Sequence, residues 1–174
     1  MGDFDKKIVF KDLVKGTLEL PENDIDQVIV KSDGIPPYAF AHVCDDHFMR
    51  VTTVTRDDSY ISSVTYHLEL WNACGFKPPK FAHLLPINVK DGNTIRKISK
   101  RKDPEAAVAF YTERGLPNEA VKFYFATLMN TNFEGWLLQS PDKSYKDFSF
   151  SFDKMSKSGP LFDLEKIINI SKNY

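Results

Sequence analysis

The alternation of strand-like and helix-like segments over the first ninety residues limits the possible folds more than any other feature. Ile8–Phe10 and Thr17–Leu20 lie on either side of a Gly16 turn and predict a hairpin. Gln27–Lys31 (QVIVK) predicts a short buried strand that ends at the turn signature Ser32–Gly34. Strands that alternate with helices predict an α/β fold.

The pattern continues with a helix over Tyr38–Phe48, because the preceding proline pair pre-sets a first helical turn. The next elements are a β-branched strand, a serine-capped helix that ends at a glycine, an extended segment and a turn: Val51–Thr55, Val64–Ala73, Phe81–Val89 and Asp91–Asn93. This number of strands predicts a partial Rossmann-type parallel sheet, because a complete nucleotide-binding domain needs more strands.

The character of the chain changes after Pro104. Apolar residues then recur at helical spacing and predict helices over Glu105–Arg114, Asn118–Met129 and Leu164–Asn169. We therefore expect two domains, residues 1–103 with the α/β pattern and residues 104–174 as a small helical domain.

Composition limits the function classes. Hydrophobic residues make up 42% of the chain, which is enough for a packed core. The balance of 23 basic and 24 acidic residues gives a net charge of −1, so nucleic acid could be held only by a local basic patch. Three features predict a cytoplasmic protein. Cys44 and Cys74 suit free thiols, no apolar run reaches about 18 residues, and no signal peptide is found.

The most distinctive stretch is Arg96–Lys102, in which five of seven residues are basic. Such a loop could neutralise a triphosphate and the charge that develops on a pyrophosphate leaving group. It could equally be a solvated run of charge, and composition alone favours this second interpretation.

A second string, Lys154–Ser158 (KMSKS), matches the signature that class I aminoacyl-tRNA synthetases use at ATP. It falls in the helical part, whereas a phosphate loop is expected to leave a sheet strand at the carboxyl edge. We therefore assign the ATP loop to Lys97–Arg101. Residues 154–158 are predicted to form a loop before the last helix that touches RNA backbone.

Other constellations give weaker signals. His42, Cys44 and His47 lack a fourth ligand, so no metal site is expected. Asp45 and Asp46 are either catalytic carboxylates or charges at a helix end. The chain has no G-x-S-x-G elbow, no G-x-G-x-x-G and no G-x-x-x-x-G-K, which argues against a hydrolase triad and a glycine-rich phosphate loop.

Several motifs, in order and over nearly the whole chain, resemble glutamyl-tRNA synthetases of class I. The matching segments are Lys31–Met49 (KSDGIPPYAFAHVCDDHFM), Val54–Arg56, Ile61–Ser63, Gly75–Leu84, Lys97–Lys102, Gly115–Ala120 and Ser158–Lys166. The resemblance implies the C-terminal half of the catalytic domain followed by a stem-contact domain. The N-terminal half would be absent, since none of the four histidines begins a His-x-Gly-His motif.

The resemblance also implies a reaction in which glutamate and ATP give glutamyl-adenylate and pyrophosphate, followed by transfer to tRNA. Arg56 would pair with the glutamate carboxylate, beside Tyr38 and His42. Lys97 and Lys100 would be catalytic and would hold the ATP phosphates, with Mg²⁺ accompanying ATP. The full set implied at ATP is Leu84, Leu85, Ile87, Lys97, Ile98, Ser99, Lys100 and Arg101.

Three residues depart from the family pattern. His42 replaces an asparagine found in many members, Asp57 replaces a glycine, and Ser59 replaces an acidic residue. Three functions follow: a ligase fragment inactive on its own, a non-catalytic paralogue that binds tRNA or protein, or half of a split enzyme that a partner chain or self-association completes.

Overall fold

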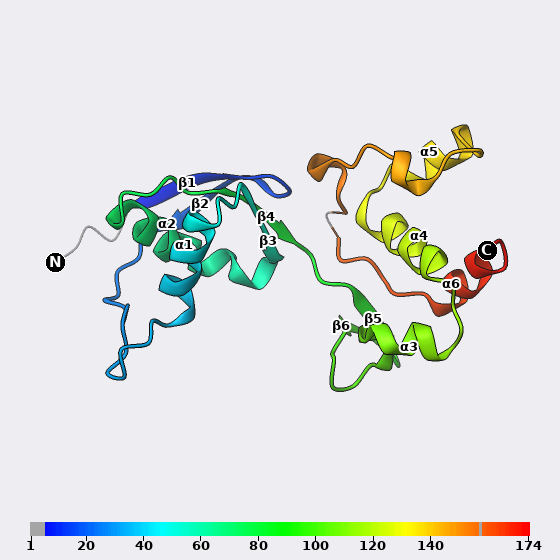
Figure 1. Ribbon diagram of the computed structural model, residues 1–174, viewed down its shortest axis with the longest axis horizontal. Helices are drawn as coiled ribbons and strands as arrows, with labels where there is room; N and C mark the ends of the chain where they lie inside the picture. Colours follow the sequence, from blue (N-terminus) through cyan, green and yellow to red (C-terminus); the bar gives the residue numbers. More distant parts are fainter. Residues whose placement is uncertain (1–5, 157) are drawn as a thin grey trace. The chain divides into compact units, whose positions relative to one another are not determined.

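The computed structural model describes residues 6–156 and 158–174, and the chain forms two compact units (Figure 1). Unit 1 ends at Leu84 and unit 2 begins at Leu85. The functional division predicted between residues 1–103 and 104–174 stays a prediction, because these units describe packing alone.

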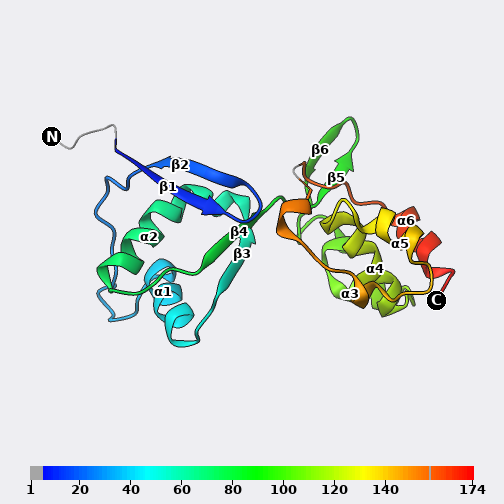
Figure 2. The same cartoon turned by 90° about the horizontal axis from the view of Figure 1, so that it is seen from above.

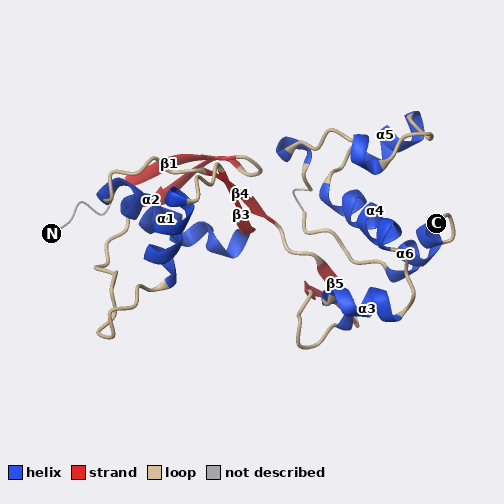
Figure 3. Ribbon diagram, in the orientation of Figure 1, coloured by secondary structure: helices blue, strands red, loops and turns tan. Residues whose placement is uncertain are grey.

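Unit 1 contains a mixed sheet, whose strands are red in Figure 3. The sheet has four strands in the order β2-β1-β4-β3. Its strands are β1 (Lys7–Asp12), β2 (Gly16–Pro21), β3 (Thr53–Asp57) and β4 (Lys80–Leu84). β1 and β2 form the predicted antiparallel hairpin, with Gly16 at a φ of 82° that favours glycine. β4 runs parallel to both β3 and β1, so the expected parallel sheet is present only in part.

Helices α1 (Tyr38–Phe48) and α2 (Val64–Ala73) pack together in unit 1 (Figure 2). Both match their predicted bounds. The short 3₁₀ helix η1 (Asp58–Ser63) leads from β3 into α2, which makes β3-α2-β4 a helical crossover between parallel strands. Val43, Leu70 and Trp71 form the buried core between the helices.

The strand predicted over residues 27–31 is wrong. That segment lies in a loop in which Val28, Ile29 and Val30 are 64%, 46% and 50% exposed. The loop folds on itself instead, since the Gly34 N–H donates to the Lys31 carbonyl at 2.9 Å. β-Branched residues favour a strand only where a neighbouring strand can pair with them, and no strand of the described chain does so here.

Unit 2 begins with an antiparallel hairpin of β5 (Asn88–Asp91) and β6 (Thr94–Lys97). Gly92, at φ 59°, lies in the predicted turn. The helical elements follow: η2 (Pro104–Ala106), α3 (Val108–Glu113), α4 (Asn118–Met129), α5 (Phe133–Gln139), η3 (Tyr145–Asp147), η4 (Phe152–Lys154) and α6 (Leu164–Ser171). Their core is built on Phe110, Tyr111, Tyr124 and Ile167.

Three details of unit 2 differ from the predictions. The helix expected from Glu105 begins only at Val108, after a 3₁₀ turn, and α5 was not predicted. In addition, the basic loop leaves β6, a strand of the two-stranded antiparallel sheet, and not a strand of the parallel part of the fold.

Candidate functional site

Five side chains from four elements meet in unit 1, and we call them the Arg56 cluster: Tyr38 and His42 on α1, Arg56 on β3, Tyr60 in η1 and His67 on α2. Ring centroids lie 5.2 Å apart for Tyr38 and His42, and 4.6 Å apart for His42 and His67. The guanidinium carbon of Arg56 is 5.4 Å from the Tyr60 ring centroid. The structure thus brings together the three residues predicted at glutamate.

Arg56 Nη1 lies 3.3 Å from His67 Nδ1. A guanidinium can only donate, so His67 Nδ1 must accept and the imidazole is neutral. Burial, aided by electrostatic interactions with His42, Arg56 and His83, lowers the pKa of His67 to about 4. His67 was not among the predicted site residues, because its sequence context carries no motif.

His42 contacts Asp46 one turn further along α1, with Nδ1 3.1 Å from the carboxylate. Burial lowers the pKa of His42, the bond to Asp46 opposes this, and the charge of Arg56 lowers it further; the net shift is downward. A neutral His42 therefore carries its proton on Nδ1 and an acceptor lone pair on Nε2. Asp46 acts here by orienting His42.

Two buried atoms of the cluster lack a hydrogen-bond partner among the described residues: His42 Nε2 and Arg56 Nε. Buried polar atoms are rarely left unpaired, because the cost is about 1–3 kcal/mol each. One atom is an acceptor and the other a donor. The cluster thus holds one acceptor and one donor that have no partner among the described residues.

The glycine expected from the resemblance at position 57 is not required by the backbone here. Asp57 is in extended conformation with φ −63°, which any residue adopts. Its carboxylate accepts from the Ser59 N–H at 3.1 Å and caps η1. Asp57 and Ser59, the two residues here that differ from the family pattern, thus both take part in the turn after β3.

A second buried polar pair, Asp12 and His83, links β1 to β4. Both side chains have no exposed surface, and Asp12 Oδ2 is 2.7 Å from His83 Nδ1. The carboxylate also accepts the N–H groups of Val14, Lys15 and His83. Burial alone would raise the pKa of Asp12, but the hydrogen bonds from His83, Lys15 and Val14 outweigh it and lower the pKa.

In unit 2, Arg96 organises the basic loop through two carboxylates. It donates to Asp91 at 2.6 Å and makes two bonds to Asp103, at 2.7 and 2.8 Å. Asp103 also accepts the Ser99 N–H at 2.7 Å. The hydrogen bond from Arg96, followed by that from Ser99, lowers the pKa of Asp103 to about 2. Arg96 is thus a structural residue of the loop.

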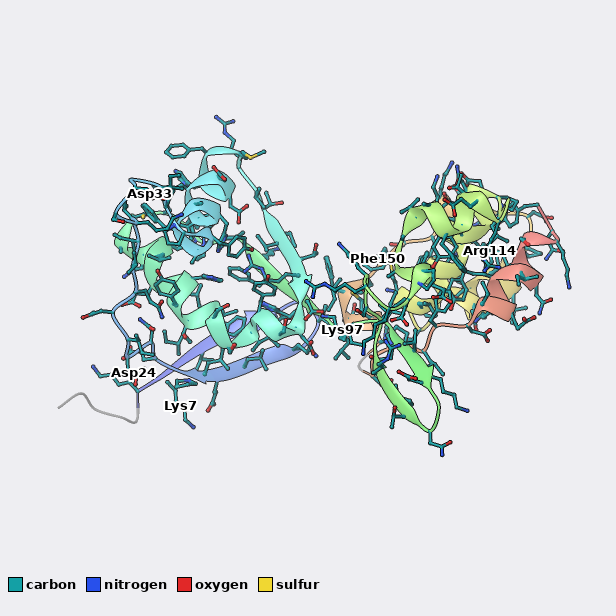
Figure 4. The ribbon with its side chains drawn as sticks, turned by 90° about the horizontal axis from the view of Figure 1, so that it is seen from below. Lys7, Asp24, Asp33, Lys97, Arg114 and Phe150 are labelled. Carbon is teal, nitrogen blue, oxygen red and sulfur yellow. The ribbon has the colours of Figure 1, made fainter. Side chains whose placement is uncertain are left out.

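The residues predicted at ATP fall in both units. Leu84 ends β4 in unit 1, whereas Leu85, Ile87 and the loop belong to unit 2. The Ile98 N–H donates to the Ile87 carbonyl at 2.9 Å, which joins two of the predicted residues. Lys97 ends β6 (Figure 4), and Lys100 is exposed beyond it. Their assignment to ATP stays a prediction.

The competing KMSKS string lies before α6, with Lys157 outside the described residues. Met155 is 8% exposed, and the Lys154 carbonyl accepts both the N–H and the hydroxyl of Thr131. Further on, the Asn88 N–H donates to the Pro160 carbonyl at 2.8 Å, so the chain returns beside β5. Met155 and Lys154 hold the loop to its own unit.

Within residues 6–156 and 158–174, no group of three or more metal-ligating side chains occurs. His47, one of the three possible ligands, stacks on Phe76 with ring centroids 3.7 Å apart. The described helices include none with the length and apolar character that a membrane span requires, and the cytoplasmic location stays a prediction.

Comparison with known proteins now identifies the class. The catalytic-domain model of the class I tRNA synthetases (E and Q) matches residues 2–168, and the chain belongs to this family. The chain is a homologue of glutamate–tRNA ligases. It is 45% identical over 172 residues to the "Glutamate--tRNA ligase" of Clostridium perfringens, and 43% identical over 173 residues to that of Acetivibrio thermocellus. Each match covers 99% of this chain and 32% of the relative, so the chain spans about a third of their length.

A solved structure agrees with these relatives. The glutamate–tRNA ligase of Elizabethkingia meningosepticum, solved in complex with its amino acid, superimposes with a TM-score of 0.79 at 30% identity. The match covers 98% of this chain and 37% of that chain, and supports an α/β fold with a mixed sheet.

The comparisons correct one prediction. The expectation of a C-terminal half of the catalytic domain, joined to a separate stem-contact domain and lacking an N-terminal half, is wrong. The catalytic-domain model covers residues 2–168 and therefore includes the helices that had been assigned to stem contact. The catalytic-domain match spans nearly the whole chain, which is about one third as long as its relatives.

Proposed function

We propose that the chain supplies the amino-acid pocket and the ATP loop of a glutamate–tRNA ligase. In this proposal Arg56 pairs with a carboxylate of glutamate, and Tyr38 and His42 contact the rest of the amino acid. Arg is suited to this role because its fork of donors matches a carboxylate. The family supports the reaction class, and the Arg56 cluster supports the location.

The observation that carries the proposal is the pair of unpartnered buried atoms in the cluster. Arg56 Nε is a donor suited to a carboxylate, and neutral His42 Nε2 is an acceptor suited to an ammonium group. An amino acid carries both groups. His42 therefore offers an acceptor at the position where many family members have asparagine.

The ATP part of the proposal rests on the basic loop. Lys97 and Lys100 hold the phosphates and stabilise the leaving pyrophosphate, and Arg101 adds charge there. Lys100 and Arg101 are exposed, and the Arg96–Asp103 pair fixes the loop beneath them. Mg²⁺ would come with ATP and shield its phosphates, and tRNA is the final acceptor.

The isolated chain is expected not to ligate glutamate to tRNA. It spans about a third of the relatives' length, and a single lost transition-state donor already costs about 3–4 kcal/mol. We therefore expect no glutamate-dependent exchange between ATP and pyrophosphate. Measurable exchange by the pure chain would contradict this part of the proposal.

The pocket is tested by calorimetric titration of the whole chain with L-glutamate. Arg56→Met is expected to weaken binding about 30-fold or more, since an unpaired buried charge costs at least about 2 kcal/mol. Arg114→Met is the matched control, because Arg114 lies over the Phe110 ring in unit 2. Equal affinity of the Arg56→Met variant and the unmodified chain would refute the pocket. Binding of tRNA without glutamate would favour the non-catalytic module.

A further inference from the structure

We infer that His67 is a positioning residue for Arg56: its neutral ring holds the guanidinium in place and leaves the full positive charge for a carboxylate ligand. The inference deepens the proposed function and rests on it. His67 touches Arg56 and not the proposed ligand. The role of His67 is to fix the position of the positively charged Arg56 guanidinium.

The contacts of Arg56 support this role. Its described polar partner is His67 Nδ1 at 3.3 Å, and no carboxylate within the described chain forms an ion pair with it. The Tyr60 and Phe81 rings lie 5.4 and 5.9 Å from the guanidinium carbon. Two rings and one neutral acceptor therefore hold the guanidinium, and none of them cancels its charge.

Arg96 in unit 2 shows the contrasting arrangement. It bonds to Asp91 and Asp103, two carboxylates that neutralise it and use its donors in the loop. Carboxylate partners are the common choice for a structural arginine. A histidine partner at Arg56 thus marks a guanidinium whose charge is kept for another group.

The groups around His67 keep it neutral. Arg56 on β3 and His42 on α1 face it, with Asp46 bonded to the far side of His42. His83 on β4 also contributes, and its own carboxylate partner is Asp12. His67 is 2% exposed, so burial and the nearby Arg56 charge both oppose protonation.

The first test needs no ligand. Long-range ¹⁵N NMR of the whole chain reports which imidazole nitrogen carries the proton. We expect His67 as the neutral tautomer with its proton on Nε2 at pH 7, and Arg56→Met to raise its titration midpoint. A proton on Nδ1, a charged ring at pH 7, or an unchanged midpoint in Arg56→Met would overturn the inference.

The second test separates positioning from folding. His67→Leu removes the acceptor and is expected to weaken glutamate binding about 10-fold or more, whereas His67→Gln keeps a neutral acceptor and restores most of the affinity. His67→Glu would hold Arg56 but neutralise it, and should bind as poorly as His67→Leu. Equal affinities for all three folded variants would contradict the inference.

The two proposals can fail separately. If the unmodified chain binds no glutamate, the proposed function fails, while the NMR experiment still decides whether His67 holds Arg56 as a neutral acceptor. If glutamate binds normally and His67 carries its proton on Nδ1, the positioning role alone is refuted.

Discussion

Removal of the Asp12 carboxylate is expected to destabilise unit 1 strongly. Asp12 accepts the buried Val14 N–H at 2.9 Å and two donors of His83, the N–H at 3.1 Å and Nδ1 at 2.7 Å. Asp12→Ala leaves these buried donors without an acceptor. Loss of one partner from a buried pair costs about 3–5 kcal/mol, a large share of the stability of a small domain.

Asp12→Asn is expected to cost less, about 2 kcal/mol. Asparagine keeps Oδ1, which accepts the Val14 and Lys15 N–H groups, but places an NH₂ donor against the N–H of His83. The predicted order of stability is therefore unmodified chain, Asp12→Asn, Asp12→Ala. The pKa of Asp12 is lower in the folded state than its ordinary value of 3.8. The stabilisation that the Asp12 carboxylate supplies is therefore present above pH 3.8 and is lost as the pH falls further.

Urea unfolding followed by tryptophan fluorescence measures this order. Trp71 is buried in unit 1 and Trp136 belongs to α5, so a Trp136→Phe background restricts the signal to unit 1. Asp33→Ala is the control, because Asp33 accepts one exposed N–H and should change stability by less than about 0.5 kcal/mol. An Asp12→Ala variant within about 1 kcal/mol of the unmodified chain would refute the reasoning.

Three further outcomes are expected. The pKa of His67 falls from 6.5 to about 4 on folding. The free energy of unfolding should therefore be highest above pH 6.5 and decline by up to about 3 kcal/mol between pH 6.5 and 4. Urea unfolding measures this decline, which should be smaller in His67→Gln. Gly159→Ala should lower the stability of unit 2 by about 1–3 kcal/mol, because the added Cβ would lie 2.8 Å from the Pro86 carbonyl oxygen. Gly135→Ala in α5 is the control: its Cβ would meet nothing within 4 Å, so the variant should be neutral or stabilising in thermal unfolding of both variants. Tyr124→Phe should cost about 1–2 kcal/mol in thermal unfolding, because the hydroxyl accepts the N–H that precedes α6 at 2.6 Å.

Local signals predicted the elements whose ends they mark. α1 and α4 begin after Pro37 and Pro117, and the hairpin of unit 2 turns at Gly92, as expected from the sequence. The two failures have different causes, one in tertiary context and one in local sequence. QVIVK has strand propensity, but no strand of the described chain pairs with it. Helix α5 contains Gly135, which weakens a helical pattern.

The members of the Arg56 cluster could be predicted only in part, and their roles stay a prediction. The resemblance predicts Tyr38, His42 and Arg56 at glutamate, and the structure places them in one cluster. His67 lies in the same cluster but has no motif around it. Asp12 and His83 are 71 residues apart, and only the order of the strands brings them together.

The strand register connects the two buried polar features of unit 1. Arg56 on β3 pairs with His83 on β4, so their side chains leave the same face of the parallel pair. On that face Asp12 fixes His83, and His67 holds Arg56. A change at Asp12 can therefore reach Arg56 through β4. Asp12→Asn should weaken glutamate binding as well as stability, whereas Gly159→Ala, which disturbs β5 in unit 2, should leave glutamate binding unchanged. Equal effects of both variants on glutamate affinity would show that the sheet register does not position Arg56.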